Sequence, residues 1–197
     1  MKERPSPNHD ERKLPVSMLV LHYTGMPDAA SAIDWLANPE SKVSAHYVVT
    51  EEGEVVRMVA EDKRAWHAGK SWWRGITDVN SASIGIEIVN PGHEWGYRAF
   101  PDAQIEALIP LVHEIVQRHG ITRGNIVGHS DVAPERKQDP GELFPWAKLA
   151  RLRLADLERQ NALGADHVAR LVIVHDRRGA AELAGLGLFR GIEDADR

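Results

Sequence analysis

The segment SAHYVVTEEGEVVRMV, residues 44–59, decides what kind of β-sheet this chain builds. Its two halves, SAHYVVT and EVVRMV, are rich in β-branched and apolar residues, as strands are. The Glu-Glu-Gly turn between them contains Gly53, whose permissive backbone suits a tight connection. The segment therefore predicts a β-hairpin, which contributes an antiparallel pair of strands.

Outside the hairpin, short apolar runs alternate with helical patterns. A helix is expected over residues 29–36, and a longer one over residues 102–119, where apolar side chains recur on one face until Gly120 ends it. Further strands are expected at residues 17–23 (SMLVLHY), 83–89 (SIGIEIV) and 125–128. Interleaved strands and helices that include a hairpin predict an α/β fold with a mixed sheet.

The remaining segments define the expected domain organisation. Residues 1–14 are polar and contain prolines, which predicts a flexible N-terminal arm before the main domain, residues 15–150. Residues 62–80 are rich in Trp, Gly and Asn without periodicity, which predicts a long functional loop. A closing helix is expected over residues 145–159, and the sequence assigns no role to the C-terminal helix and extension, residues 151–197.

The composition narrows the classes of function. The net charge of −5 argues against nucleic acid as a partner. No apolar run approaches the roughly 20 residues that span a bilayer, and no signal-peptide core precedes the first strand. If residue 1 is the true start, we expect a cytoplasmic monomer without membrane contact, with a periplasmic location as the alternative. The absence of cysteine excludes disulfides, thiolate metal sites and a cysteine nucleophile.

Two of the ten histidines stand apart, because His22 and His129 each lie at the C-terminal end of an apolar strand. Strand ends hold ligands rigidly and open toward a cleft. Asp139, followed by a Pro-Gly turn, offers an anionic oxygen as a third ligand. Two imidazoles and one carboxylate suit zinc and leave a fourth position for water. The alternative is that both histidines are ordinary buried residues at strand ends.

Two charged residues could serve such a metal site. Glu87 interrupts an apolar strand and points away from its isoleucines, so it either faces water or acts as a base beside the metal. Lys137 precedes Asp139 by two residues, so both would project to one side of an extended segment. The lysine could then stabilise an oxyanion, or it could be a solvated side chain.

Six motifs occur in an order that is typical of one enzyme family. They are LHYTGM, SAHYVV with EEGEV, AWHAG, NSASIGIEIVN, FPDAQIEALIPLV and GHSDVAPERKQDPG. Over about residues 16–150 the chain resembles the zinc-dependent N-acetylmuramoyl-L-alanine amidases of the AmpD and AmiD type, which are related to phage lysozyme amidases and peptidoglycan recognition proteins. The resemblance implies a mixed central sheet flanked by helices, with one zinc in a groove.

The resemblance also assigns roles to particular residues. The zinc ligands that it implies are His22, His129 and Asp139, with Glu87 as the catalytic glutamate and Lys137 as the transition-state lysine. Phage-type relatives carry a catalytic tyrosine where this chain has Ala45, which leaves more of the chemistry to the glutamate. Asp131 is expected to brace its loop or to orient His129. The positions that resemble supporting or groove residues are His46, Trp66, His67, Gly69 and Asn80, with a core histidine as the alternative for His46.

The implied function is zinc-dependent hydrolysis of the amide bond between N-acetylmuramic acid and L-alanine in muropeptides. Cytoplasmic recycling of 1,6-anhydromuropeptides is the expected role. One alternative is an envelope amidase that acts on intact peptidoglycan, since the wording of several motifs resembles the AmiD branch more closely. The other is a non-catalytic peptidoglycan-binding module, whose usual sign is the loss of a zinc ligand.

Overall fold

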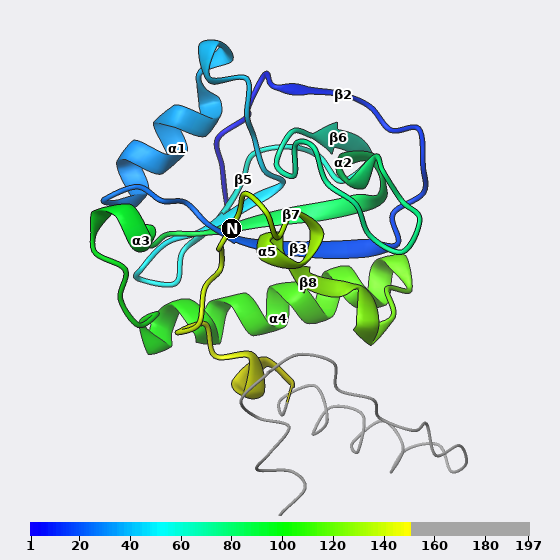
Figure 1. Cartoon of the computed structure of the whole chain (residues 1–197). Coiled ribbons are helices and arrows are strands. Elements are labelled where there is room, and N and C mark those ends of the chain that lie inside the picture. The colour runs from blue at the N-terminus through cyan, green and yellow to red at the C-terminus, as the bar shows by residue number, and fades with distance from the viewer. Residues whose placement is uncertain (151–197) are drawn as a thin grey trace, which may run out of the picture. The chain divides into compact units, whose positions relative to one another are not determined.

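The computed structural model describes residues 1–150, and its centre is a six-stranded sheet in the order β1-β5-β4-β7-β3-β8 (Figure 1). The strands are β1 (Lys2–Glu3), β3 (Met18–Tyr23), β4 (Tyr47–Val49), β5 (Val55–Arg57), β7 (Ser83–Ile88) and β8 (Ile126–Gly128). Only β4 and β5, the expected hairpin, run antiparallel within this sheet, and its other neighbouring strands are parallel. The predicted mixed sheet is therefore confirmed.

Helices cover both faces of the sheet (Figure 1). Helix α4 (Asp102–His119) packs its apolar side on the isoleucines of β7, and Gly120 ends it with a left-handed φ of 63°, as the sequence predicts. Helices α1 (Ala29–Ala37) and α2 (Val79–Ala82) pack on the opposite face. Because side chains alternate along a strand, Glu87 lies on the face away from α4. This second face carries the candidate site.

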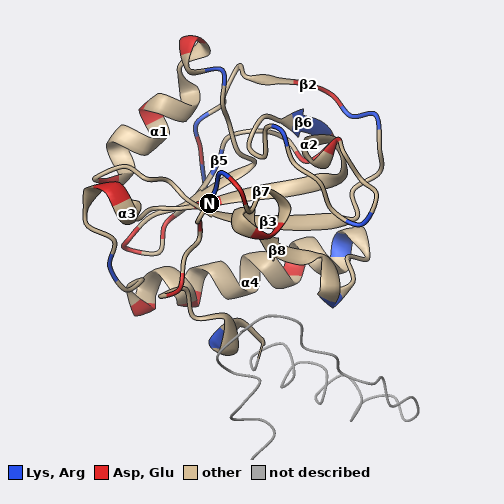
Figure 2. Ribbon diagram, in the orientation of Figure 1, with Lys and Arg blue, Asp and Glu red and all other residues tan. Residues whose placement is uncertain are grey.

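The expectation of a flexible arm over residues 1–14 is wrong in this structure. Strand β1 pairs with β5, and β2 (His9–Glu11) pairs with β6 (Lys63–Ala65) in a separate two-stranded sheet. Acidic residues of β2 pair with basic residues of β6, which are coloured red and blue in Figure 2, and a 2.6 Å ion pair joins Glu11 and Lys63. The side-chain amide of the buried Asn8 donates to two backbone carbonyls of the loop after α1. Polar contacts order this segment, so its polar composition was misleading.

The predicted loop over residues 62–80 contains β6 near its start and reaches α2 at its end, and it is otherwise irregular. Residues 146–150 are helical, which agrees with the start of the predicted closing helix. The rest of that helix and the extension, residues 151–197, lie outside the described residues. The other short elements are η1 (Pro39–Ser41), α3 (Gly92–Trp95), η2 (Arg123–Asn125) and α5 (His129–Val132).

None of the helices within residues 1–150 has both the length and the apolar character that crossing a membrane requires.

Candidate metal centre and active site

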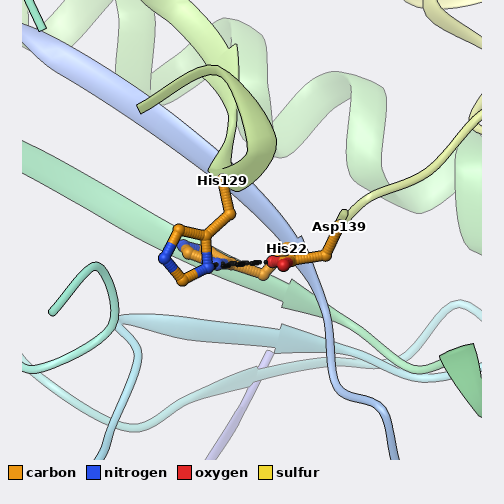
Figure 3. Close-up of side chains that lie close together, drawn as sticks. All are labelled: His22, His129 and Asp139. Carbon is orange, nitrogen blue, oxygen red and sulfur yellow. Dashed lines mark hydrogen bonds and ion pairs between the residues drawn. The ribbon is translucent and has the colours of Figure 1, made fainter. Parts of the chain in front are cut away.

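Three side chains from distant parts of the chain meet at one edge of the sheet (Figure 3). His22 is the penultimate residue of β3, and His129 directly follows the parallel strand β8, so the carboxyl ends of both strands bring the imidazoles together. The Nδ1 atoms of the two rings are 2.9 Å apart, and Asp139 Oδ2 lies 3.0 Å from His22 Nδ1 and 3.1 Å from His129 Nδ1. All three residues are buried.

The three converging atoms have the chemistry of a metal site. The backbone carbonyl of Ala68 lies 3.0 Å from Nε2 of His129. Because a carbonyl only accepts hydrogen bonds, Nε2 carries the proton of the neutral ring and Nδ1 presents a lone pair to the cluster. Ligand atoms around a tetrahedral zinc with bonds of about 2.0–2.1 Å lie roughly 3.3 Å apart, so a shift of a few tenths of an ångström would admit the ion. The residues therefore fit zinc.

Burial keeps His22 in the form that binds a metal. It lowers the pKa of His22 to about 4, and the neighbouring His129 acts in the same direction. Near neutral pH the His22 ring is therefore uncharged and can offer its nitrogen lone pair.

Glu87 stands beside the cluster, because its Cα pairs with that of His22 across the parallel strands β3 and β7. Both side chains therefore lie on the same face and line the same groove, together with Lys137. The Oε2 atom of Glu87 is buried and has no hydrogen-bond partner in the described part of the chain. Burial raises the pKa of Glu87 well above its usual value, and the charge of Asp139 adds to this effect. A carboxyl group with a raised pKa is a stronger base than an ordinary one, as a group that accepts and returns a proton needs to be.

The site opens into a groove of about 380 Å³, a size typical of small-molecule sites. Much of its wall has no signal in the sequence, because helical periodicity does not tell which apolar side chains a groove leaves exposed. Trp35 of α1 is 48% exposed and Trp95 of α3 is 70% exposed, and both line the groove. Other residues of the wall that the sequence did not indicate are Met26, Leu36, Val43, Tyr23 and His93.

Of the predicted supporting residues, two lie in the interior and not along the groove. His46 is fully buried, and its Nδ1 accepts a hydrogen bond from the backbone N–H of Gly85. Asn80 is also buried, and its Oδ1 accepts hydrogen bonds from the backbone N–H groups of His67 and Ala68.

The other predicted positions lie nearer the groove. Trp66 and His67 line it, although the His67 ring is mostly buried behind His22. Gly69 has a left-handed φ of 58° and lies against the guanidinium of Arg136. That guanidinium donates to the carbonyls of Ala68 and Lys70.

Asp131 accepts a hydrogen bond of 2.8 Å from the backbone N–H of Gly128. It therefore braces the turn that leads from β8 into His129, which is one of the two roles expected for it.

Comparison with known proteins identifies the class to which this fold and site belong. The model of the N-acetylmuramoyl-L-alanine amidase family matches residues 12–142, and the chain belongs to this family. The family resemblance drawn from the six sequence motifs is thereby confirmed.

The chain is similar to amidases of two kinds, named AmiD and AmpD. The chain is 42% identical over 148 residues to N-acetylmuramoyl-L-alanine amidase AmiD of Escherichia coli K12; the match covers 69% of this chain and 52% of AmiD, so the chain spans about half the length of that relative. It is 35% identical over 164 residues to 1,6-anhydro-N-acetylmuramyl-L-alanine amidase AmpD of Enterobacter cloacae, which covers 73% of this chain and 85% of AmpD.

A solved structure of E. coli AmiD, in complex with the substrate anhydro-N-acetylmuramic acid-L-Ala-D-gamma-Glu-L-Lys, superposes with a TM-score of 0.65 at 34% identity. The superposition covers 91% of this chain and 70% of that one. The expected α/β fold, with a mixed central sheet flanked by helices, is thus shared with this relative.

Proposed function

We propose that this protein hydrolyses the amide bond between N-acetylmuramic acid and L-alanine in muropeptides, with zinc held by His22, His129 and Asp139. The observation that carries the proposal is the meeting of three metal-binding atoms with the buried, unpartnered carboxyl oxygen of Glu87 in one groove. The names of the relatives support it, since both AmiD and AmpD are called amidases of this bond.

The residues around the cluster divide the reaction between them. Zinc, when bound, supplies a Lewis acid that polarises a carbonyl and makes water more acidic. Glu87 takes a proton from the attacking water while the oxygen of that water bonds to the lactyl carbonyl carbon. The ammonium group of Lys137, which lines the same groove, stabilises the negative charge on the carbonyl oxygen. The carbon–nitrogen bond then breaks, and Glu87 returns the proton to the departing amine of L-alanine.

We further propose that the substrate is a 1,6-anhydromuropeptide and that the enzyme works in cytoplasmic recycling. The name of AmpD and the substrate in the AmiD complex both include the anhydro sugar, which supports this choice. Intact peptidoglycan remains the alternative, because AmiD, at 42% identity, has a name that does not restrict the sugar.

The test is to incubate the zinc-loaded protein with an anhydromuropeptide, with the same muropeptide carrying a free reducing end, and with intact sacculi. Released stem peptide is measured by liquid chromatography and mass spectrometry. We expect the wild type to release stem peptide from the anhydromuropeptide, and we expect a matched Asp139→Ala variant to release none. A strong preference for sacculi would refute the recycling role. Binding of peptidoglycan without any peptide release would instead identify a non-catalytic binding module.

A further inference from the structure

The segment of His67 and Ala68 contacts both histidine ligands from the side opposite the cluster. Nδ1 of His67 lies 3.0 Å from Nε2 of His22, and the carbonyl of Ala68 lies 3.0 Å from Nε2 of His129. Each of these two consecutive residues therefore contacts Nε2 of one ligand imidazole, the ring nitrogen that does not face the cluster. The orientation of a ligating histidine depends on the partner of that second nitrogen.

The contact with His22 is the end of a chain of hydrogen bonds whose direction is fixed. The hydroxyl of Ser83 donates to the carbonyl of Val79 at 2.5 Å, and Ser83 Oγ lies 3.3 Å from Nε2 of His67. Because a carbonyl cannot donate, Ser83 is the donor to Val79 and the acceptor for His67. His67 must then accept at Nδ1 from Nε2–H of His22. This order leaves a lone pair on Nδ1 of His22, the atom that faces the cluster.

Asn80 holds the segment in place. Its Oδ1 accepts from the backbone N–H of His67 at 3.1 Å and from that of Ala68 at 2.7 Å, and the residue is only 6% exposed. One buried amide oxygen thus fixes the backbone that presents both the His67 ring and the Ala68 carbonyl.

The sheet leaves a space for the His67 ring. A Cβ atom added at Gly85 would lie 2.4 Å from Cγ of that ring, which is far inside contact distance. Gly85 lies two residues before Glu87 on β7, so both face the site side of the sheet. Any larger residue at this position must displace the ring that braces His22.

We propose that His67 and Asn80 are positioning residues of the metal centre, which set the tautomer and the orientation of both histidine ligands. The proposal rests on the proposed zinc-dependent function. It is more specific than the sequence-based expectation, which counted both among supporting or groove residues. It predicts that their loss weakens metal binding, an effect that loss of a substrate contact does not produce.

The test measures zinc affinity by competition with a chelator and the visible spectrum of the cobalt-substituted protein. We expect His67→Phe, which leaves Nε2–H of His22 buried without an acceptor, to lower zinc affinity about 10- to 100-fold and to alter the cobalt spectrum. His67→Asn places an oxygen near the position of Nδ1 and should restore most of the affinity. Asn80→Leu should behave like His67→Phe, and Asn80→Asp, which keeps the acceptor, should behave like the wild type.

Asn8→Leu is a matched control, since Asn8 is a buried asparagine that also holds backbone groups but lies in the N-terminal segment. We expect it to lower stability and to leave zinc affinity unchanged. The Gly85→Ala substitution gives a second, independent measure. It should weaken zinc binding in the wild type and have little further effect in a His67→Ala background, where the ring is missing.

The outcomes separate this proposal from the proposed function. If the wild type binds no zinc and releases no peptide, the proposed function fails. If the wild type binds zinc and the His67→Phe and Asn80→Leu variants keep its affinity and cobalt spectrum, the positioning proposal is overturned and the function stands. An equal loss from Gly85→Ala with and without the His67 ring would also overturn it. If His67→Phe or Asn80→Leu does not fold, the test uses His67→Asn, Asn80→Asp and the Gly85→Ala pair. Low zinc affinity in both His67→Asn and Asn80→Asp would then count against the positioning proposal.

Discussion

Replacing Glu87 by glutamine should strongly lower activity and at the same time stabilise the metal-free protein. The substitution keeps the size of the side chain and removes its charge. In the structure the Oε2 atom is buried without a partner among the described residues, and burial raises the pKa of the carboxyl group well above its usual value of 4.5. Folding therefore works against the ionised form of this group at neutral pH.

The size of the effect follows from that geometry. A buried polar atom without a hydrogen bond costs about 1–3 kcal/mol, and more when it is charged. Glutamine leaves its own amide partly unpaired, so we expect a gain of about 1 kcal/mol, which raises the melting temperature of a chain of this size by about 2–4 °C. Activity should fall about 10²- to 10⁴-fold, the range for loss of a general base.

The pH dependence fixes the sign of this prediction. A carboxyl group whose pKa is higher in the folded state binds more protons there than in the unfolded state. The wild type therefore loses stability as the pH rises from 4.5 through the higher folded pKa, and Glu87→Gln removes this loss. The stabilisation should be absent below pH 4.5 and should grow as the pH rises above it.

The assay combines thermal unfolding of the metal-free protein across this pH range with peptide release by the zinc-loaded protein. Glu106→Gln is the control, because Glu106 is exposed on α4 and away from the groove, and both quantities should stay unchanged. A Glu87→Gln variant that is less stable than the wild type at neutral pH would refute the reasoning, as would one that keeps its activity.

Three further predictions follow from the groove and the buried histidines. Lys137→Met should lower kcat about 10²- to 10³-fold with little change in KM, since the lysine acts on charge that develops in the transition state. A rise in KM of that size with an unchanged kcat would contradict this role. Trp35→Ala should raise KM several-fold without lowering kcat, because the exposed indole lines the groove and takes no part in the proposed chemical steps. Trp72→Ala, at an exposed position outside the groove, should change neither. His22 should contribute about 3 kcal/mol to the stability that the metal-free protein loses as the pH falls from 6.5 to 4, since burial lowers the pKa of His22 to about 4 and the unfolded chain takes up this proton first. A His22→Gln variant with the same acid dependence in circular dichroism would count against that assignment.

The central sheet could be predicted because local signals agree with its tertiary structure. Gly53 adopts the left-handed φ of 81° that the hairpin turn needs, and Gly120 ends α4 in the same way. The candidate metal ligands could also be predicted, because parallel strands carry their C-terminal residues to one edge of the sheet. His22 and His129 therefore meet at that edge, and the loop that follows His129 adds the third candidate ligand, Asp139.

The rest of the site depends on packing that has no local signal. The N-terminal strands are ordered by polar contacts with other segments, so the polarity of residues 1–14 indicated the wrong state. The sequence marks Asn80 and His67 as candidate site residues, but it does not show which groups their side chains contact. Their role depends on how β6 and α2 pack behind β3 and β7, and on the space that Gly85 leaves for one ring.

The most direct test of the central claim is a zinc titration of the metal-free protein during peptide release from an anhydromuropeptide. We expect activity to rise linearly and to stop rising at one equivalent of zinc, and we expect Asp139→Ala to show no such rise. Full activity without zinc, or an unchanged titration after the loss of Asp139, would contradict it.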